Sequence, residues 1–109
     1  MEPEQGQGPG GAEYVLHLYI TGATPNSTQA VRNLKDICER YLAGRYELQI
    51  VDIYQQPEMA QEARIVAAPT LVKRSPGLTR WLVGDLSDRR RVLALLGLSP
   101  DPNDPYLHG

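Results

Sequence analysis

The sequence contains a single cysteine, Cys38, no phenylalanine and one tryptophan among its 109 residues. One cysteine excludes an internal disulfide, a Cys-x-x-Cys redox pair and a zinc site built on cysteines. The longest uninterrupted apolar run, residues 92–96, is far shorter than the roughly 20 residues that span a bilayer. The first residues are rich in Glu and Gly, where a secretory signal would be basic and then apolar. These absences predict a soluble, cytoplasmic protein.

The net charge of the chain is small, but its charged residues are unevenly distributed along the sequence. The formal net charge of −2 and the pI of about 5.6 argue against binding to nucleic acid or membranes by the molecule as a whole. The segment 64–91 nevertheless has a local charge of +5, and its basic residues are Arg64, Lys73, Arg74, Arg80, Arg89, Arg90 and Arg91. A solvated face, a phosphate or nucleic-acid site and a protein interface are the three interpretations. No glycine-rich phosphate loop accompanies the segment, whereas Trp81 lies within it, so we favour the interface.

Both ends of the chain have little to bury. Residues 1–13 are dominated by Gly, Glu, Gln and Pro, and residues 99–109 contain three prolines and two aspartates. Neither segment can offset its ordering entropy by burial, so both are predicted to be disordered tails. The folded domain is predicted to be residues 14–98, which is enough for one core.

Periodicity within this domain predicts alternating strands and helices. Residues 14–20 are apolar on both faces except for His17, as in a central strand, and 45–51 alternate as in an edge strand. Between them, apolar residues spaced by three and four predict a helix, capped by Asn26 and ended by Gly44.

The second half continues this pattern. Pro57 suits the start of a short helix, and residues 70–74 and 79–83 form two strands joined by a turn. Ser87 is predicted to cap a last helix that ends at Gly97. The order β-α-β-α-β-β-α predicts an α/β single domain of the thioredoxin-like type.

Thioredoxin-like redox enzymes carry their cysteines in the loop after the first strand, here residues 22–27, which contain no sulfur. Cys38 lies on the apolar face of the first predicted helix and is interpreted as a core residue. His17 is interpreted as structural, and Asp85 and Asp88 as capping residues rather than a catalytic pair. Pro69 stands where such folds carry a cis-proline. We therefore predict no catalytic residue, metal ligand or cofactor.

Four stretches of the domain resemble the KaiB family of circadian clock proteins. The first and last, with Leu-Tyr-x-x-Gly-x-Thr-Pro-Asn-Ser and Gly-Asp-Leu-Ser-Asp, are long enough to be specific. The matching stretches are residues 16–27, 46–53, 65–71 and 83–89. They include Pro69, Gly84 and Asp85, to which we assign structural roles.

The resemblance implies a binding protein rather than an enzyme. KaiB-family proteins bind the ATPase ring of the hexameric kinase KaiC, recruit KaiA or displace the histidine kinase SasA, and shift KaiC toward dephosphorylation. By matching residue type, Arg64, Lys73 and Arg80 are expected in the interaction or oligomer surfaces. The edge strand, with Gln49 and Asp52, is where a KaiA-like partner would add a strand. The resemblance also implies fold switching between a tetrameric ground state and a thioredoxin-like monomer, hence a homo-oligomer, dimer or tetramer, at rest.

The last helix departs from the family pattern, because Leu95 and Gly97 stand where core-clock members carry Gly and Asp. Leu raises helix propensity over Gly by roughly half a kcal/mol or more, which favours the thioredoxin-like state. This departure, and the unusual ends, also allow a divergent homologue that acts in stress response.

A glutathione-transferase-like enzyme is the alternative from another class. In that interpretation the hydroxyl of Thr24 or Ser27 would lie near a bound thiolate, and Ala68-Pro69 would bind the backbone of the peptide substrate. Against it, Asp85-Leu86-Ser87 stands where such enzymes favour Glu/Gln-Ser.

Overall fold

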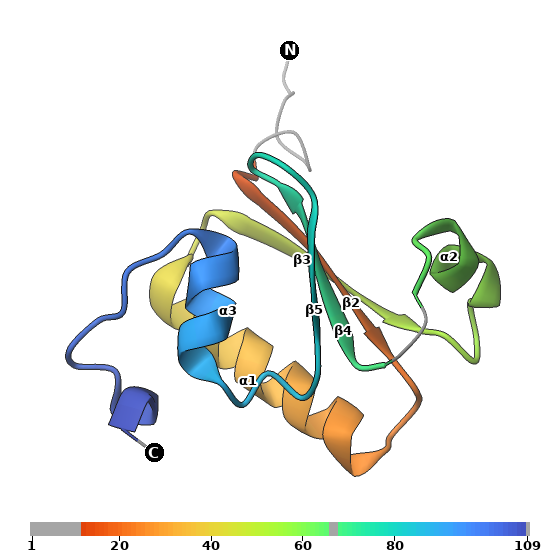
Figure 1. The fold of residues 1–109 in the computed structure, drawn as a ribbon, viewed down its shortest axis with the longest axis horizontal. Helices are drawn as coiled ribbons and strands as arrows, with labels where there is room; N and C mark the ends of the chain where they lie inside the picture. The colour runs from red at the N-terminus through yellow and green to blue at the C-terminus, as the bar shows by residue number, and fades with distance from the viewer. Residues whose placement is uncertain (1–11, 66–67, 109) are drawn as a thin grey trace.

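Four strands form one mixed sheet in the computed structural model, which describes residues 12–65 and 68–108 (Figure 1). The spatial order is β3-β2-β4-β5, with β2 parallel to β3 and antiparallel to β4, and β4 antiparallel to β5. This order confirms residues 14–20 as a central strand and the following strand as an edge. The strands are β2 (Tyr14–Ile20), β3 (Tyr46–Asp52), β4 (Thr70–Ser75) and β5 (Arg80–Val83).

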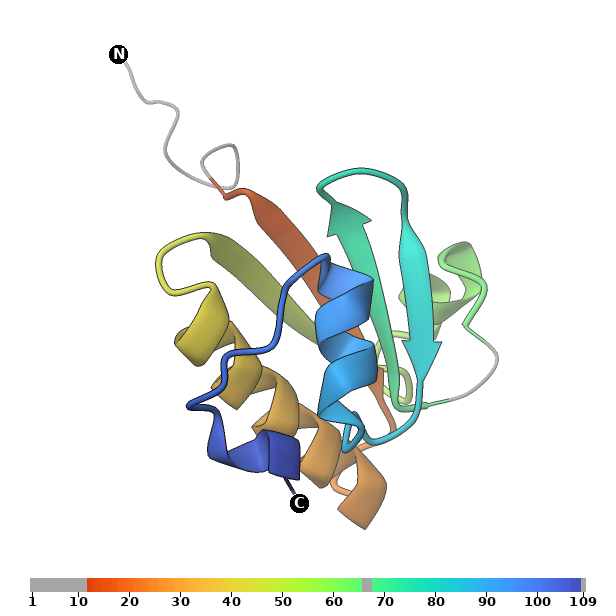
Figure 2. The same ribbon diagram turned by 60° about the vertical axis from the view of Figure 1, so that its left-hand side comes forward.

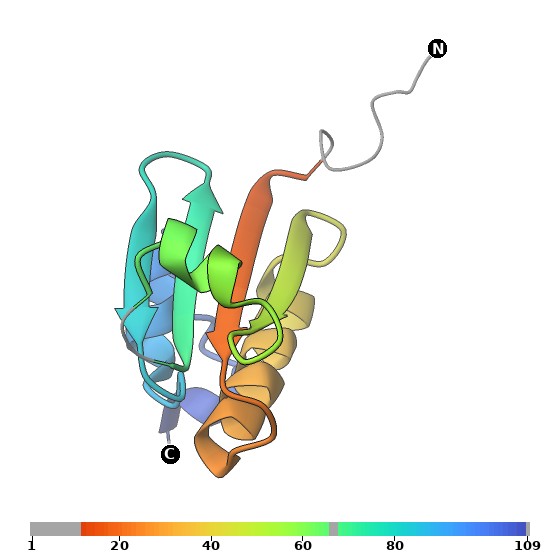
Figure 3. The same ribbon diagram turned by 90° about the vertical axis from the view of Figure 1, so that its right-hand side faces the viewer.

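Helices cover the two faces of the sheet unequally. The helices are α1 (Pro25–Tyr41), α2 (Pro57–Glu62), α3 (Arg89–Leu96) and the 3-10 turn η2 (Pro105–His108). Helices α1 and α3 pack side by side over one face (Figure 2), whereas the short α2 lies alone across the other (Figure 3). The predicted thioredoxin-like α/β order is therefore confirmed.

Alternation along β2 divides its side chains between two clusters. Leu16 and Leu18 face α1 and α3 and join the large core, whereas Tyr19 faces α2 and joins a small cluster with Val51 and Val72. Because a strand directs successive side chains to opposite faces, one apolar strand serves both clusters. The stretch is apolar on both faces for this reason.

Two helix starts differ from the prediction by a residue or two. Thr24, not Asn26, caps α1, and its hydroxyl accepts a hydrogen bond from the Ser27 amide at 3.4 Å. Pro25 has a fixed φ suited to the first helical position, which moves the start toward the N-terminus. Asp88, not Ser87, caps α3 by accepting from the Arg91 amide at 3.3 Å.

The C-terminal end of the chain differs from the predicted disordered tail. The prediction is wrong for residues 99–108, which pack on α1 and α3 and bury Asp104 completely. Composition could not reveal this because the partners of Asp104 lie on α1 and α3. The predicted N-terminal tail, residues 1–13, falls outside the described residues except for its last two, of which Glu13 pairs with Arg45 at 2.9 Å.

Candidate functional site

The loop between β2 and α1 holds hydroxyl groups where a redox enzyme of this fold would hold thiols. Ser27 is completely buried, and its Oγ accepts from the Thr21 amide at 3.0 Å. The Oγ1 of Thr21 lies 3.3 Å from both Ser27 Oγ and Thr24 Oγ1. These contacts fix the loop on the start of the helix and leave Ser27 inaccessible to a substrate.

Cys38 is a buried core residue of α1, as predicted. Burial, reinforced by the neighbouring charge of Glu39, raises the pKa of its thiol to about 12. The nucleophile in thiol chemistry is the thiolate, which is negligible at neutral pH for such a group. Cys38 therefore contributes packing to the site's scaffold rather than reactivity.

His17 lies half-buried on the α2 side of β2. Its Nδ1 accepts a hydrogen bond from Arg74 Nε at 3.3 Å, which requires the neutral ring. Burial and the charge of Arg74 lower the pKa of His17, and Glu47 opposes this shift. Within residues 12–65 and 68–108, no group of three or more His, Cys, Asp or Glu side chains is placed to hold a metal ion.

The α2 side of the sheet has an open half beside β5. Trp81 and Val83 are 52% and 57% exposed there. With Arg64, Ile65 and Thr70 they line a hollow of about 240 Å³, which we call the Trp81 surface. A half-exposed Trp next to an Arg is the composition of an interface hot spot rather than of a catalytic cleft.

The predicted basic residues are not brought together on one face. Arg64 lies on the α2 side in a left-handed backbone conformation with φ of 58°. Lys73 and Arg80 are paired in register on the opposite side, where both border a hollow next to the end of α3. Arg89, from the same segment, is buried. The +5 segment therefore does not form the continuous basic face that a nucleic-acid site requires.

Lys73 is buried and hydrogen-bonded within the domain, unlike a residue that is free to contact a partner. It is only 5% exposed, and its ammonium group donates to the carbonyls of Pro76 and Leu78 in the turn between β4 and β5. Burial, followed by the charge of Arg80, lowers the pKa of Lys73. Lys73 thus holds the turn from which the exposed Leu78 and Arg80 project.

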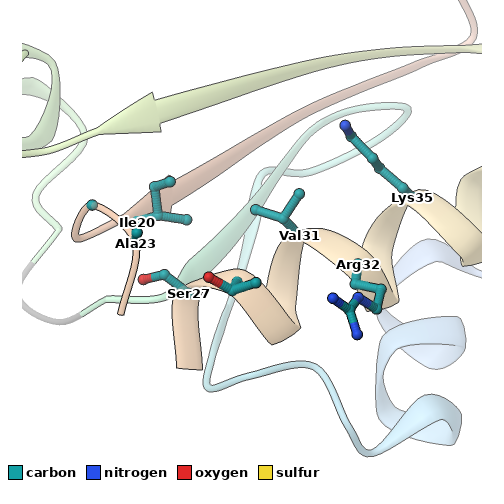
Figure 4. Close-up of a pocket in the computed structure, with 8 residues that line it drawn as sticks. Ile20, Ala23, Ser27, Val31, Arg32 and Lys35 are labelled. Carbon is teal, nitrogen blue, oxygen red and sulfur yellow. The ribbon is translucent and has the colours of Figure 1, made fainter. Parts of the chain in front are cut away.

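A second surface follows the open edge of the sheet between α1 and β3. Residues of α1 and the end of β2 line a hollow of about 470 Å³ there. Figure 4 shows Val31 and Lys35 of α1 and, from β2, Ile20. Lys35 also borders an adjoining hollow of about 410 Å³ with Leu48 and Ile50 of β3. We call these two hollows the edge groove.

The two predicted residues of the edge strand lie beside the edge groove rather than inside it. Gln49 is exposed and paired in register with His17, so its side chain projects on the α2 side. Asp52 ends β3, and its carboxylate accepts from the Tyr54 amide at 2.9 Å. The groove-lining positions are instead the alternate residues Leu48 and Ile50.

The three residues assigned structural roles lie around the start of β4 and the end of β5. Pro69 is buried, and the peptide bond before it is cis, as expected. Its carbonyl accepts from the amide of Gly84, at 2.9 Å, and Gly84 has a φ of 128° that favours glycine. The carbonyl of Asp85 accepts from Asn33 of α1, and its carboxylate accepts from the Ser87 amide in the turn before α3, whose cap is Asp88.

Sequence reasoning missed the edge groove and the buried Asp104. The groove sets Val31 and Lys35 of α1 beside Ile20 of β2, and the spacing of residues along α1 does not show which sheet residues lie opposite them. The sequence offered one sign that the tail containing Asp104 packs on the domain, namely the large side chains of Tyr106 and Leu107 in an otherwise polar segment.

None of the helices in the described part of the chain has both the length and the apolar character needed to cross a membrane.

Comparisons with known proteins agree with this geometry. The KaiB domain model matches residues 17–98. The chain is 47% identical over 88 residues to a circadian clock oscillator protein KaiB of Prochlorococcus marinus, covering 81% of this chain and 74% of the relative. It is 48% identical over 85 residues to the KaiB of Nostoc punctiforme, covering 78% of this chain and 82% of that relative.

Solved structures show the same fold. The N-terminal domain of Synechococcus elongatus SasA is 25% identical, with a TM-score of 0.64 over 93% of this chain and 96% of that domain. Thioredoxin of Malassezia sympodialis is 22% identical, with a TM-score of 0.66 over 81% and 78% of the two chains. The family model and the similarity to clock proteins, on a thioredoxin-like fold without redox cysteines, show that the chain belongs to the KaiB family of circadian clock proteins.

Proposed function

We propose that this protein binds the ATPase ring of a KaiC-type hexameric kinase and thereby shifts the kinase toward its dephosphorylated state. Recruitment of a KaiA-like partner, or displacement of a SasA-like histidine kinase, follows from that binding. The proposed activity is recognition rather than catalysis, and it requires no cofactor. Membership of the KaiB family supports the class of partner, and the open Trp81 surface supports the mode of contact.

The observation that carries this proposal is the exposure of Trp81 beside Arg64, on the half of the α2 side that α2 leaves open. A large aromatic side chain that stays half-exposed contributes little to the core, but it buries much apolar area when a partner covers it. Arg64 and Arg74 supply positive charge on the same side, which suits an acidic partner surface. Arg80 lies on the opposite side of the hairpin, away from the Trp81 surface.

The test is binding of the full chain to a KaiC-type hexamer with ATP or ADP, measured by native mass spectrometry and by the phosphorylation state of the kinase. Trp81→Ser and Arg64→Ser are expected to weaken binding, with Trp81→Ser costing at least about 2 kcal/mol, or roughly 30-fold. Leu78→Ser is the matched control, because Leu78 is an exposed apolar residue of the same hairpin outside the Trp81 surface. Failure of the unmodified chain to bind any KaiC-type ring would refute the proposal.

A second candidate function is capture of a KaiA-like partner by strand addition at β3. The edge groove supports it, since an added strand would hydrogen-bond to β3 and place alternate side chains against Leu48 and Ile50. Ile50→Asp is expected to abolish capture of the KaiA-like protein while binding to the KaiC-type ring persists. Equal loss of both interactions would argue against a separate edge site.

The glutathione-transferase alternative has no support from the geometry. Ser27 is buried and hydrogen-bonded to Thr21, so it cannot approach a thiolate, and the hydroxyl of Thr24 is engaged as the cap of α1.

A stress-response role would use the same surfaces with a different KaiC-type homologue. Capture experiments with each KaiC-type protein of the host distinguish that role from timekeeping, and light scattering on the free chain tests the expected dimer or tetramer.

A further inference from the structure

The segment after α3 turns back over the helices instead of leaving the domain. Gly97 has a left-handed φ of 74°, and the Leu98 amide donates to the Leu93 carbonyl at 2.8 Å, which closes the helix and reverses the chain. Residues 98–108, which we call the C-terminal strap, then cross from α3 toward α1 (Figure 2). Leu98 and Leu107, near its two ends, pack against the main core.

Between these apolar ends, the strap buries one carboxylate. Asp104 is completely inaccessible to solvent. Its oxygens accept from Tyr41 Oη of α1 at 2.8 Å, from Arg89 Nε of α3 at 2.9 Å and from the Tyr106 amide at 3.0 Å. A buried carboxylate is tolerated only when it is paired and hydrogen-bonded in this way. The contact is therefore specific to one position of the strap.

Arg89 makes the matching connection from the other side. It is the first residue of α3, is 6% exposed, and its Nη2 donates to Asp36 of α1 at 2.5 Å. The ring of Tyr106 lies 4.8 Å from its guanidinium carbon, within range of a cation–π contact. One guanidinium group thus joins α1, α3 and the strap.

Tyr41 adds a further connection between α1 and the strap. Its hydroxyl donates to Asp104 and accepts from the amide of Asp101 at 3.0 Å. Both roles of the hydroxyl are therefore used, and both partners belong to the strap. Replacing the hydroxyl by hydrogen would remove two contacts without altering the ring that packs against the core.

We propose that the C-terminal strap is a latch that holds α3 on α1, so that loss of the Asp104 contacts releases α3 while the β2–β3 half stays folded. A helix of eight residues is too short to be stable alone in water, so α3 depends on what docks it. Its docking rests on three apolar residues, Val92, Leu93 and Leu96, and on the network around Arg89. Tyr14 of β2 also touches α3, because its hydroxyl donates to the Leu96 carbonyl at 3.1 Å. The pairing of β2 with β3, in contrast, involves no residue of the strap.

Hydrogen exchange of the full chain, resolved by segment, tests the latch. Asp104→Asn is expected to speed exchange of the α3 amides at least tenfold, while the amides of β2 exchange at the unmodified rate. Tyr41→Phe is expected to act in the same direction and keeps the experiment decisive if Asp104→Asn does not fold. Glu62→Gln removes one exposed carboxylate from α2 and serves as the matched control for the change in charge.

Two results would overturn the latch. Unchanged α3 exchange in both variants would mean that the strap packs on α3 without holding it. Equal acceleration in α3 and β2 would mean that Asp104 stabilises the whole domain rather than one docking event. Faster exchange confined to α3 and the strap, with Glu62→Gln unchanged, would support it.

Discussion

The two faces of the sheet differ in how completely helices cover them. On one face, α1, α3 and the C-terminal strap enclose the large core, which includes the fully buried Leu16, Leu34 and Ile37. On the other face, the short α2 covers only the small cluster around Tyr19 and Val72, and Trp81 and Val83 remain more than half exposed. The closed face therefore holds most of the buried core, and the open face leaves apolar area exposed.

This division explains how a thioredoxin-like domain can act without thiols. The loop that carries redox chemistry in thioredoxins is fixed here by Thr21, Thr24 and Ser27. The single cysteine of the chain, Cys38, is buried, and burial raises the pKa of its thiol. The thioredoxin-like scaffold is retained, and the surfaces that we propose for binding are the Trp81 surface and the edge groove. Function lies in the sites that a fold displays rather than in the fold itself.

The largest expected effect contrasts a core residue with an open-face residue. Leu34→Ala, in the closed face, is expected to lower the free energy of unfolding by about 2–5 kcal/mol, because it removes buried contacts and leaves a cavity. Val83→Ala, at the open face, is expected to lower it by about 0.5 kcal/mol or less, as is usual for surface positions. Urea unfolding followed by circular dichroism measures both, and similar losses would contradict the division between faces.

Acid is expected to weaken the closed face through Asp104. Burial alone would raise the pKa of Asp104, but hydrogen bonds from the Tyr106 amide, Tyr41 and Arg89 hold that pKa below its ordinary value of 3.8. A carboxyl group with a lowered pKa stabilises the folded state above pH 3.8 and loses this contribution as the pH falls through the folded-state pKa. Unfolding free energies measured from pH 5 downward should therefore decline less steeply in Asp104→Asn, and parallel curves would contradict this assignment.

The smallest expected effect concerns His17 on the open face. Because burial and Arg74 lower its pKa below 6.5, the neutral ring favours the folded state, and this contribution is lost as the pH falls below 6.5. Arg74→Gln removes the neighbouring charge, so the pKa of His17 is expected to rise. Titration of the His17 ring by NMR measures the shift, with Arg90→Gln as a control for the loss of a positive charge elsewhere. An unchanged pKa in Arg74→Gln would contradict the contact.

Most of the fold follows from patterns a few residues long. The apolar stretch at 14–20, the alternation at 45–51 and the turn residues before β5 predicted the strands within a residue or two, because strand periodicity is local. The helix starts shifted for equally local reasons, since Pro25 and Asp88 were better placed to begin the helices than the residues chosen. The open edge at β3 was also predictable, from the polar Glu47 and Gln49 in an alternating strand.

The site was less predictable, because it depends on which side of a strand each residue faces in the assembled sheet. Arg64, Lys73 and Arg80 read as one basic group in the sequence, yet Arg64 lies on the α2 side and the other two lie on the α3 side. Lys73 is drawn into the turn by two carbonyl groups, so its charge is not displayed. The spacing of residues in a sequence does not show whether a long basic side chain is buried. Such a side chain can bury its methylene groups while its ammonium group donates to whichever carbonyl groups the fold places nearby.

The sequence by itself determined the order of strands and helices, the lack of a redox cysteine pair and the family, since these depend on residue types at short spacing. Tertiary structure alone decided that the proline-rich end is ordered, because Asp104 finds its partners at Tyr41 and Arg89, on helices that only the fold places side by side. It also decided which apolar side chains remain exposed, since α2 is too short to cover β5. Contacts between distant segments depend on the whole packed arrangement, which local patterns do not encode.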